Sequence, residues 1–367
     1  MKKIIYPTNP IINTKDTLNL IKTCLDKNFP NENILTKNFE NILKKLLKVQ
    51  HVILTTSGTS AIYLALKANN IGKGDEVIIP NITFPATANA VHMTGAKVVL
   101  ADVSKKNLLL DVDLLKKKFT KKTRAIVPVH ISGRGNNIQN LKKFADRKKV
   151  VIIEDAAEAL GSKYRNKSLG TFGVCGCFSL APNKIITTGQ GGIVVTNNKK
   201  LYKKMTQLRD QGRYRDKKNE SKYNYRGFNF KFTDLQSSLG LSQIKNFKVR
   251  KGKLLNIYNF YKKNLIQSKH FKVIGFDVKN GELPLWTDVY CFKAKSLFKF
   301  LKKRGIFCRL FWDPINTLKP YKTSFKYLQA SKKLKSNLMW LPSGQNIKKD
   351  ELKFICSSIN QFFKFKS

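Results

Sequence analysis

HVILTTSGTSAIYLAL, residues 51–66, joins a short apolar run to a helical pattern through a turn that contains a glycine. It predicts a buried strand at 52–54 and a helix over 59–69. Similar units follow, with strand-like runs at 77–79, 98–100, 125–129 and 150–153 and helical segments at 85–94, 111–119 and 137–147. Continuously apolar strands that alternate with helices predict an α/β fold with a mostly parallel sheet covered on both faces.

The flanking segments complete the predicted organisation. Two helices, predicted at 15–26 and 37–48, precede this alternation. It is followed by a strand at 193–196, a helix at 198–211 and a polar, mobile loop at 210–226. A helical stretch over 232–266 is long enough to join two domains. Beyond it, strands are predicted at 271–274 and 306–311 and helices at 294–304 and 349–364. We therefore expect a large domain at 1–250 and a smaller C-terminal α/β domain at 251–367.

The charge balance is the most unusual property of the composition. Among 367 residues, 70 Lys+Arg and 23 Asp+Glu give a net charge of +47. Such an excess can indicate a nucleic-acid binder, but the lysines are spread over almost every predicted surface and do not form one stripe. A general compositional bias explains this better, so we expect no dedicated nucleic-acid partner. The positive field would still steer anionic substrates.

Cysteine spacing and hydropathy indicate neither a metal site nor a membrane protein. The six cysteines form no C-x-x-C pair and no disulfide framework typical of secreted proteins. The apolar run near the N-terminus is too short for a signal peptide, and no run approaches the ~20 apolar residues that span a bilayer. We expect a soluble, cytoplasmic protein with reduced thiols, no metal and no membrane span.

The turn within the quoted segment has the features of a phosphate site. Gly58 permits a tight turn, Ser57, Thr59 and Ser60 supply hydroxyls, and the following helix presents free N–H groups and the positive end of its dipole. An ordinary Ser/Thr N-cap is the alternative interpretation.

Polar and aromatic residues follow two other predicted strands. Glu154 and Asp155 come directly after the strand at 150–153, at the edge of the sheet where ligands bind. Asp155 is suited to hold a protonated ring nitrogen, or else it caps the next helix. Phe84 follows the strand at 77–79 and offers a face on which a ring can stack, although an isolated Phe is more often part of the core.

Lys184 lies in SLAPNKIITTGQGG, residues 179–192, which leads into the apolar run at 193–195. A polar, glycine-flanked turn at the start of a buried strand can desolvate an amine and use it as a nucleophile. A solvated surface lysine is the alternative. A phosphate cradle, a stacking aromatic, an acid for a ring nitrogen, the hydroxyl of Ser179 and a Schiff-base lysine together match the requirements of pyridoxal 5′-phosphate.

The sequence resembles the DegT/DnrJ/EryC1/StrS family of sugar aminotransferases, which act mostly on nucleotide-linked keto-deoxy-sugars. The resemblance covers nearly the whole chain. The motifs that carry it are Ser57-Gly58-Thr59, Gly74-Asp75-Glu76-Val77, Ala86-Thr87-Ala88-Asn89-Ala90, Pro128-Val129-His130, Glu154-Asp155-Ala156-Ala157, Gly176-Cys177-Phe178-Ser179, Lys184 to Gly192, and Phe228 to Gln236. It implies an aspartate-aminotransferase-like fold, fold type I for this cofactor.

The resemblance also implies a role for each candidate residue. Lys184 would hold the cofactor through a Schiff base, and Asp155 would pair with its ring nitrogen. The residues implied in phosphate binding are Gly58, Thr59 or Ser60, Ser179, and Asn229 from across a dimer interface, while Phe84 would stack on the ring. Related dehydratases have histidine in place of the lysine. Glu158 departs from the glutamine of many members, so we expect it to be protonated, turned away or facing a substrate group.

These assignments predict a homodimeric aminotransferase for amino-sugar and surface-polysaccharide synthesis. Glutamate would donate an amino group to a nucleotide-linked keto-deoxy-sugar, with a 4-keto-6-deoxy-hexose favoured. Three arginines are candidate ligands for a diphosphate or carboxylate: Arg213, Arg226 and Arg309. A 3-keto-sugar, a cyclitol ketone and a non-catalytic cofactor-binding regulator remain alternatives, and the nucleotide, GDP, UDP or dTDP, stays open.

Overall fold

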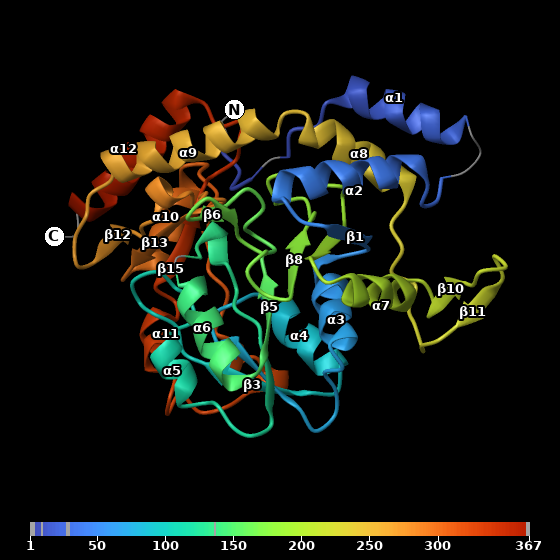
Figure 1. Cartoon of the computed structure of the whole chain (residues 1–367). Helices are drawn as coiled ribbons and strands as arrows, with labels where there is room; N and C mark the ends of the chain where they lie inside the picture. The colour runs from blue at the N-terminus through green and yellow to red at the C-terminus, as the bar shows by residue number, and fades with distance from the viewer. Residues whose placement is uncertain (1–3, 9, 27–29, 136, 365–367) are drawn as a thin grey trace.

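A seven-stranded sheet is the largest sheet of the computed structural model, which describes residues 4–8, 10–26, 30–135 and 137–364 (Figure 1). Its spatial order is β1 (His51–Thr55), β9 (Gly192–Thr196), β8 (Cys175–Ser179), β5 (Val151–Asp155), β4 (Thr123–Ile126), β2 (Glu76–Pro80) and β3 (Lys97–Ala101). β9 pairs antiparallel with β1 and β8, whereas the strands from β8 to β3 pair in parallel. The predicted α/β fold with a mostly parallel sheet is confirmed.

Alternate residues of β1 belong to two cores. Val52 and Leu54 pack in one cluster with residues of α2 (Ile34–Leu47) and α6 (Ile138–Lys148). Ile53 packs in the other cluster, to which the remaining covering helices belong: α3 (Gly58–Ala68), α4 (Pro85–Met93) and α7 (Lys199–Arg209). Because successive side chains of a strand point to opposite faces, this continuously apolar strand is buried on both sides of the sheet.

A second sheet has four antiparallel strands (Figure 1). They are β12 (Phe271–Val273), β13 (Thr287–Cys291), β15 (Leu338–Leu341) and β14 (Arg309–Leu310), with α10 (Ala294–Lys303) and α12 (Lys349–Lys364) in the same core. Ile5 joins this core and forms a bridge with Ile306. β13 and β15 were not predicted, and the predicted strand at 306–311 is reduced to β14. A boundary at residue 250 stays a prediction.

The remaining helices and turns connect these sheets. They are α1 (Thr14–Leu25), α5 (Val112–Lys116), α8 (Asp234–Ile244), α9 (Phe247–Asn264), α11 (Gln329–Leu334), and the 3-10 turns Ile131–Gly133, Val278–Asn280, Ile315–Thr317 and Lys319–Tyr321. The helical stretch predicted over 232–266 consists of two helices, because it breaks at Asn246, whose φ and ψ are −97° and 16°. Asparagine favours turns over helix interiors. Among the described residues, no helix combines the length and apolar character needed to cross a membrane.

The predicted mobile loop at 210–226 contains a hairpin instead. β10 (Arg213–Arg215) pairs with β11 (Ser221–Tyr223), and the hairpin projects from the body of the protein (Figure 1). The carboxylate of Asp216 accepts the N–H groups of Lys218 and Glu220, both at 2.9 Å, and so closes the turn. The many charges of this segment concealed its strand pattern. A shorter hairpin joins β6 (Lys163–Tyr164) to β7 (Lys167–Ser168).

A buried aspartate anchors α2. Asp234, at the start of α8, is 4% exposed and accepts the N–H groups of Asn33, Leu35 and Thr36 at 2.9, 3.1 and 2.9 Å. The hydroxyl of Thr36 donates to the same carboxylate at 2.7 Å. Asn33, the residue at the N-cap position of α2, makes no side-chain cap bond. A distant carboxylate therefore caps this helix and complements its dipole.

Glu40 of α2 makes the stability of the fold depend on pH. Its Oε1 accepts the N–H of Leu54 at 3.2 Å, and burial raises the pKa of Glu40 from 4.5 to about 7, although Arg209 opposes the shift. Since the pKa is higher in the folded state, this acid favours folding while protonated. Its contribution falls as pH rises from the unfolded pKa of 4.5 to about 7.

Glu40→Gln should remove this pH dependence. We expect the free energy of unfolding of the wild-type protein to fall relative to that of the variant between about pH 4.5 and about pH 7. Urea unfolding at a series of pH values measures the difference. Glu220→Gln, in the exposed hairpin, is the control and should follow the wild-type curve. Parallel curves for wild type and Glu40→Gln would contradict the assignment.

Candidate active site

A cavity of about 310 Å³ lies where the parallel strands of the large sheet have their carboxyl ends. It brings together most of the residues singled out in the sequence: Gly58, Thr59, Phe84, Asp155, Glu158, Ser179, Lys184 and Arg309. Residues of the small sheet close its far side. A concave pocket at this edge of an open α/β sheet is the usual place for a ligand.

The start of α3 forms one wall of the cavity. Ser57 Oγ accepts the N–H of Ser60 at 3.1 Å, and Ser60 Oγ accepts the N–H of Ser57 at 2.9 Å. Ser60 is thereby turned inward, is 5% exposed and does not line the cavity. A Cβ atom on Gly58 would lie 3.0 Å from Ser179 Cβ, so glycine lets α3 approach Ser179 closely. This wall offers helix N–H groups and hydroxyls to an anion.

Asp155 lies at the end of β5 and is 4% exposed. Its oxygens accept the hydroxyl of Thr87 at 2.7 Å and the N–H of Ala157 at 3.1 Å. Burial raises the pKa of Asp155, although both hydrogen bonds oppose the shift. A carboxyl in this position favours a cationic partner in the cavity, because a nearby positive charge would stabilise its ionised form.

Lys184 and Glu158 face each other across the floor of the cavity. Lys184 Nζ donates to Glu158 Oε1 at 3.2 Å, and the side chains are 12% and 6% exposed. The second oxygen of Glu158 accepts the N–H of Ser132 at 2.9 Å. The expectation for Glu158, that it would be protonated, turned away or facing a substrate group, did not include this contact with the amine of Lys184.

The contacts of Glu158 continue into the small sheet. Ser132, whose φ is +53°, donates through its hydroxyl to Asp288 on β13 at 2.9 Å. Arg134 forms an ion pair with Asp288, and it also donates to the carbonyls of Ile274 and Gly275, both at 3.0 Å. Burial raises the pKa of Asp288, with Arg134 opposing the shift. No pattern in the sequence points to these residues, because only the tertiary structure brings them together.

Glu154, the neighbour of Asp155, has no part in the cavity lining. It is fully buried and accepts the N–H groups of Gly170, Phe172 and Gly173 at 2.8, 2.6 and 2.7 Å. His130 Nε2 lies 2.7 Å from its Oε2. Glu154 therefore holds the chain between β5 and β8 in place. The two adjacent acids of this motif thus differ in role, because Asp155 lines the cavity and Glu154 does not.

Aromatic side chains form another wall of the cavity. Phe84 is 52% exposed and its ring centroid lies 5.5 Å from that of Trp312. Trp312 contacts Trp340 at 4.7 Å, and Trp340 contacts Trp286 at 5.5 Å. The guanidinium of Arg309 lies 6.0 and 5.6 Å from the rings of Trp286 and Trp340. Sequence reasoning missed the three tryptophans, since they come from separate segments and follow no motif.

Three predicted residues lie on or beside the hairpin and outside this cavity. Arg213 is exposed and pairs with Asp210 at 2.6 Å. Arg226 and Asn229 are exposed as well, and the main chain of Asn229 forms a bridge with Asp210. Within one copy of the chain they are separated from Lys184.

The cavity has the features that pyridoxal 5′-phosphate requires. The close approach of α3 to Ser179 suits a phosphate, the buried carboxyl of Asp155 suits a ring nitrogen, and Lys184 supplies an amine with little exposure. No cluster of metal ligands occurs among the described residues. An amine, a buried carboxyl and a phosphate cradle in one cavity fit this organic cofactor.

Comparisons with known proteins agree with this chemistry. The profile of the DegT/DnrJ/EryC1/StrS aminotransferase family matches residues 12–360. GDP-perosamine synthase of Escherichia coli O157:H7 is 30% identical over 351 residues, which are 94% of each chain. GDP-perosamine synthase of Vibrio cholerae is 32% identical over 334 residues, 89% of this chain and 90% of that one.

A solved structure is similar over the whole chain. Helicobacter pylori PseC, an aminotransferase involved in the biosynthesis of pseudoaminic acid, superposes with a TM-score of 0.92 at 26% identity. The match covers 99% of this chain and 100% of that one. The structural similarity to an aminotransferase therefore agrees with the family that the sequence comparison identifies.

Gly58→Ala should weaken the binding of pyridoxal phosphate. The added methyl group must displace Ser179, since its Cβ lies 3.0 Å away. We expect a Kd higher by roughly tenfold, which corresponds to about 1.4 kcal/mol. A titration followed by absorbance measures the change.

Gly252→Ala in α9 is the matched control. A Cβ atom there meets no atom within 4 Å, so the Kd should stay the same. Alanine should raise the free energy of unfolding by roughly 0.5–1 kcal/mol, because it is the better helix former. Equal affinities of the Gly58→Ala and wild-type proteins would contradict a phosphate cradle at α3.

Proposed function

The chain belongs to the DegT/DnrJ/EryC1/StrS aminotransferase family, and from this membership we propose that it transfers the amino group of glutamate to a nucleotide-linked 4-keto-6-deoxy-hexose. It is a transaminase dependent on pyridoxal phosphate. The observation that carries the proposal is the meeting of Lys184, Asp155 and the start of α3 in one cavity. The product would serve amino-sugar and surface-polysaccharide synthesis.

The residues of the cavity divide the chemistry among them. Bound pyridoxal phosphate supplies a carbonyl carbon for amines and a ring that accepts electrons. The N–H groups of α3 and the hydroxyl of Ser179 would hold the phosphate, and Asp155 would keep the ring nitrogen protonated. Lys184 would bind the cofactor and then move a proton as general base and acid. Glu158, at 3.2 Å from Nζ, would hold this amine in place.

The aromatic wall would give the sugar a place in the cavity. Phe84 would stack on the cofactor ring, which leaves the half-buried Trp312 beside it as a surface for the hexose. Trp340 and Phe311 pack against Trp312 and fix its orientation. Arg309 is exposed next to this wall and would bind the diphosphate. The two GDP-perosamine synthases support a nucleotide sugar as the substrate class.

A second copy of the chain would complete the site. Asn229, Arg213 and Arg226 are exposed on or beside the hairpin and do not reach the cavity of their own chain. In a homodimer, Asn229 of one copy would contact the phosphate bound by the other. Arg213 and Arg226 would add positive charge near the nucleotide.

The substrate can be identified with isotope-labelled glutamate. GDP-, UDP- and dTDP-linked 4-keto-6-deoxy-hexoses are incubated with the enzyme and ¹⁵N-glutamate, and the amino sugars are detected by mass spectrometry. A 3-keto-sugar and a cyclitol ketone form the other arms of the panel. We expect ¹⁵N in a 4-amino sugar, and no product from Lys184→Ala. Amination of the 3-keto-sugar or the cyclitol alone would overturn the proposed substrate, and failure with every acceptor and amino donor would overturn the reaction.

Trp312→Ala should impair the reaction with the keto-sugar and leave the reaction with glutamate unchanged. The loss of the stacking surface is expected to raise the KM for the keto-sugar by roughly 10- to 200-fold, the range for a lost apolar contact. The reaction of the bound cofactor with glutamate, followed by absorbance, should proceed as in the wild type. Phe292→Ala is the control, since Phe292 is 57% exposed and lies outside the cavity lining. An unchanged KM would place the sugar elsewhere.

A further inference from the structure

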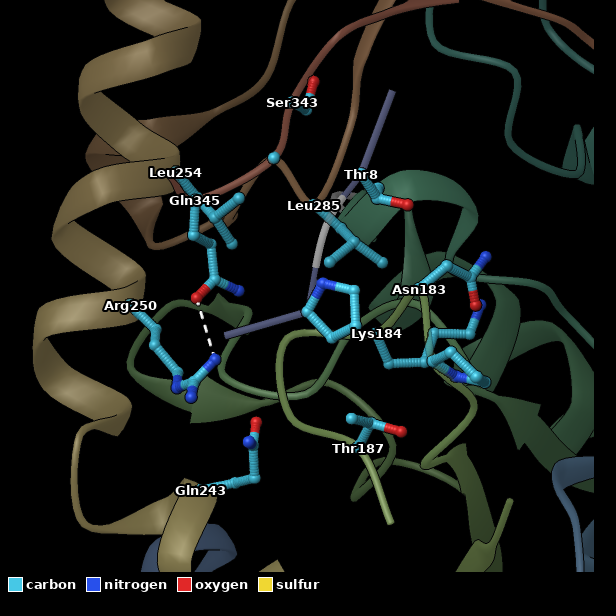
Figure 2. A pocket seen from close by; sticks show the side chains of 13 residues that line it. Thr8, Asn183, Lys184, Thr187, Gln243, Arg250, Leu254, Leu285, Ser343 and Gln345 are labelled. Carbon is cyan, nitrogen blue, oxygen red and sulfur yellow. Dashed lines mark hydrogen bonds between the residues drawn. The ribbon is translucent and has the colours of Figure 1, made fainter. Parts of the chain in front are cut away.

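A second, smaller cavity borders Lys184 (Figure 2). It shares Asn183 and Lys184 with the main cavity, while Arg250 of α9, Gln243 of α8 and Gln345 belong to its wall alone. Its volume of about 20 Å³ has room for roughly one water molecule. This cavity is too small for a substrate. Its wall residues are of interest because of the main-chain groups that they contact.

Two side chains of this wall hold the carbonyl group of Ile185, the residue after Lys184. Gln345 Nε2 donates to it at 3.2 Å, and Arg250 Nη1 donates at 3.5 Å. Arg250 Nη1 also donates to Gln345 Oε1 at 3.0 Å, the dashed line in Figure 2. Because the guanidinium binds the amide oxygen, the amide nitrogen of Gln345 is directed towards Ile185.

Arg250 binds a third segment as well. Its Nη2 donates to the carbonyl of Ile11 at 2.7 Å, and Gln243 Nε2 donates to the same carbonyl at 2.7 Å. One guanidinium therefore joins the chain before α1, the loop after β15 and the loop that carries Lys184. This last loop, 180–191, contains no helix or strand, so its main chain depends on contacts of this kind.

The burial of Arg250 indicates what the guanidinium is used for. Arg250 is 6% exposed, burial lowers its pKa, and among the described residues no carboxylate pairs with it. A buried cation without a counter-charge destabilises a fold unless hydrogen bonds replace its hydration. The carbonyls of Ile11 and Ile185 and the amide of Gln345 provide these bonds to Nη1 and Nη2, whereas Nε has no hydrogen-bond partner among the described residues. The rigid fork of donors, which lysine lacks, matches three acceptors at once.

We propose that Arg250 and Gln345 are positioning residues for Lys184. They fix the main chain next to Lys184, so that Nζ stays in the main cavity, 3.2 Å from Glu158 Oε1. Neither side chain lines the main cavity, so both act through the loop and not on the reacting atoms. The inference rests on the proposed role of Lys184 as the residue that binds pyridoxal phosphate.

Arg250→Met removes the donors and keeps much of the buried volume. In the full-length protein without cofactor, the amides of 180–191 should exchange with deuterium about tenfold faster, the factor for one lost hydrogen bond to a charged group. Borohydride should then trap pyridoxal phosphate on Lys184 more slowly, as mass spectrometry measures. Arg250→Lys retains a charged donor. Its exchange rate and its trapping rate should therefore lie between those of Arg250→Met and the wild type.

Gln345→Glu separates positioning from stability. The new carboxylate would pair with Arg250 and raise the free energy of unfolding, yet it has no N–H group for the carbonyl of Ile185. If Gln345 positions the loop, the amides of 180–191 should exchange with deuterium faster in this variant than in the wild type, although the variant is the more stable protein. Unchanged or slower exchange would overturn the proposal. This variant keeps the test decisive if Arg250→Met does not fold.

Arg209→Met is the matched control. Arg209 is also 6% exposed and donates to a main-chain carbonyl, that of Leu54, at 3.0 Å. Unlike Arg250, it also pairs with a carboxylate, that of Glu32, at 2.6 Å. Its loss should lower stability and leave the exchange of 180–191 and the trapping rate unchanged. If the amides of 180–191 exchange as fast in Arg209→Met as in Arg250→Met, Arg250 has no specific role in holding this loop. If borohydride traps the cofactor on Lys184→Ala protein, the role of Lys184 fails, and the exchange rates still decide whether Arg250 holds the loop.

Discussion

The ion pair between Lys184 and Glu158 is the contact on which the arrangement of the site depends. Lys184 lies between β8 and β9, and Glu158 follows β5, so the pair joins the ends of neighbouring strands. Both side chains are largely buried, and the loss of either would leave the other charge uncompensated at a high cost. A neutral amide in place of Glu158 would accept the same hydrogen bond with less attraction for the amine.

From Glu158 the polar contacts lead into the second sheet. Ser132 joins Glu158 to Asp288, and Arg134 neutralises Asp288. Trp286 directly precedes the strand that carries Asp288, and Asp288 pairs in register with Trp340. The carboxylate that connects the sheets thus also sets the position of the aromatic wall. The amine and the wall, although they come from different sheets, are therefore connected through one polar network.

The sequence predicted the parts of this protein that follow from local pattern. Apolar strands such as β1 and β2 are buried on both faces, and Lys184 and Asp155 follow strands whose carboxyl ends meet at one edge. The aromatic wall had no such signal, because the antiparallel pairing of β13 with β15 brings distant segments together. The hairpin at Arg213–Tyr223 was hidden by its charges, and the contact between Arg250 and Ile185 depends on side chains from distant parts of the chain.

Several of the few acids of this basic chain lie inside the fold. Glu154, Asp234 and Asp288 are buried and bind main-chain N–H groups, hydroxyls or Arg134. Most lysines on the surface therefore keep an uncompensated charge, and the net charge of +47 is displayed to the solvent. A field of this kind accelerates the arrival of any anion, whatever its base or sugar. Discrimination between nucleotide sugars must then come from short-range contacts, and Trp312 and Arg309 line the cavity that contains Lys184.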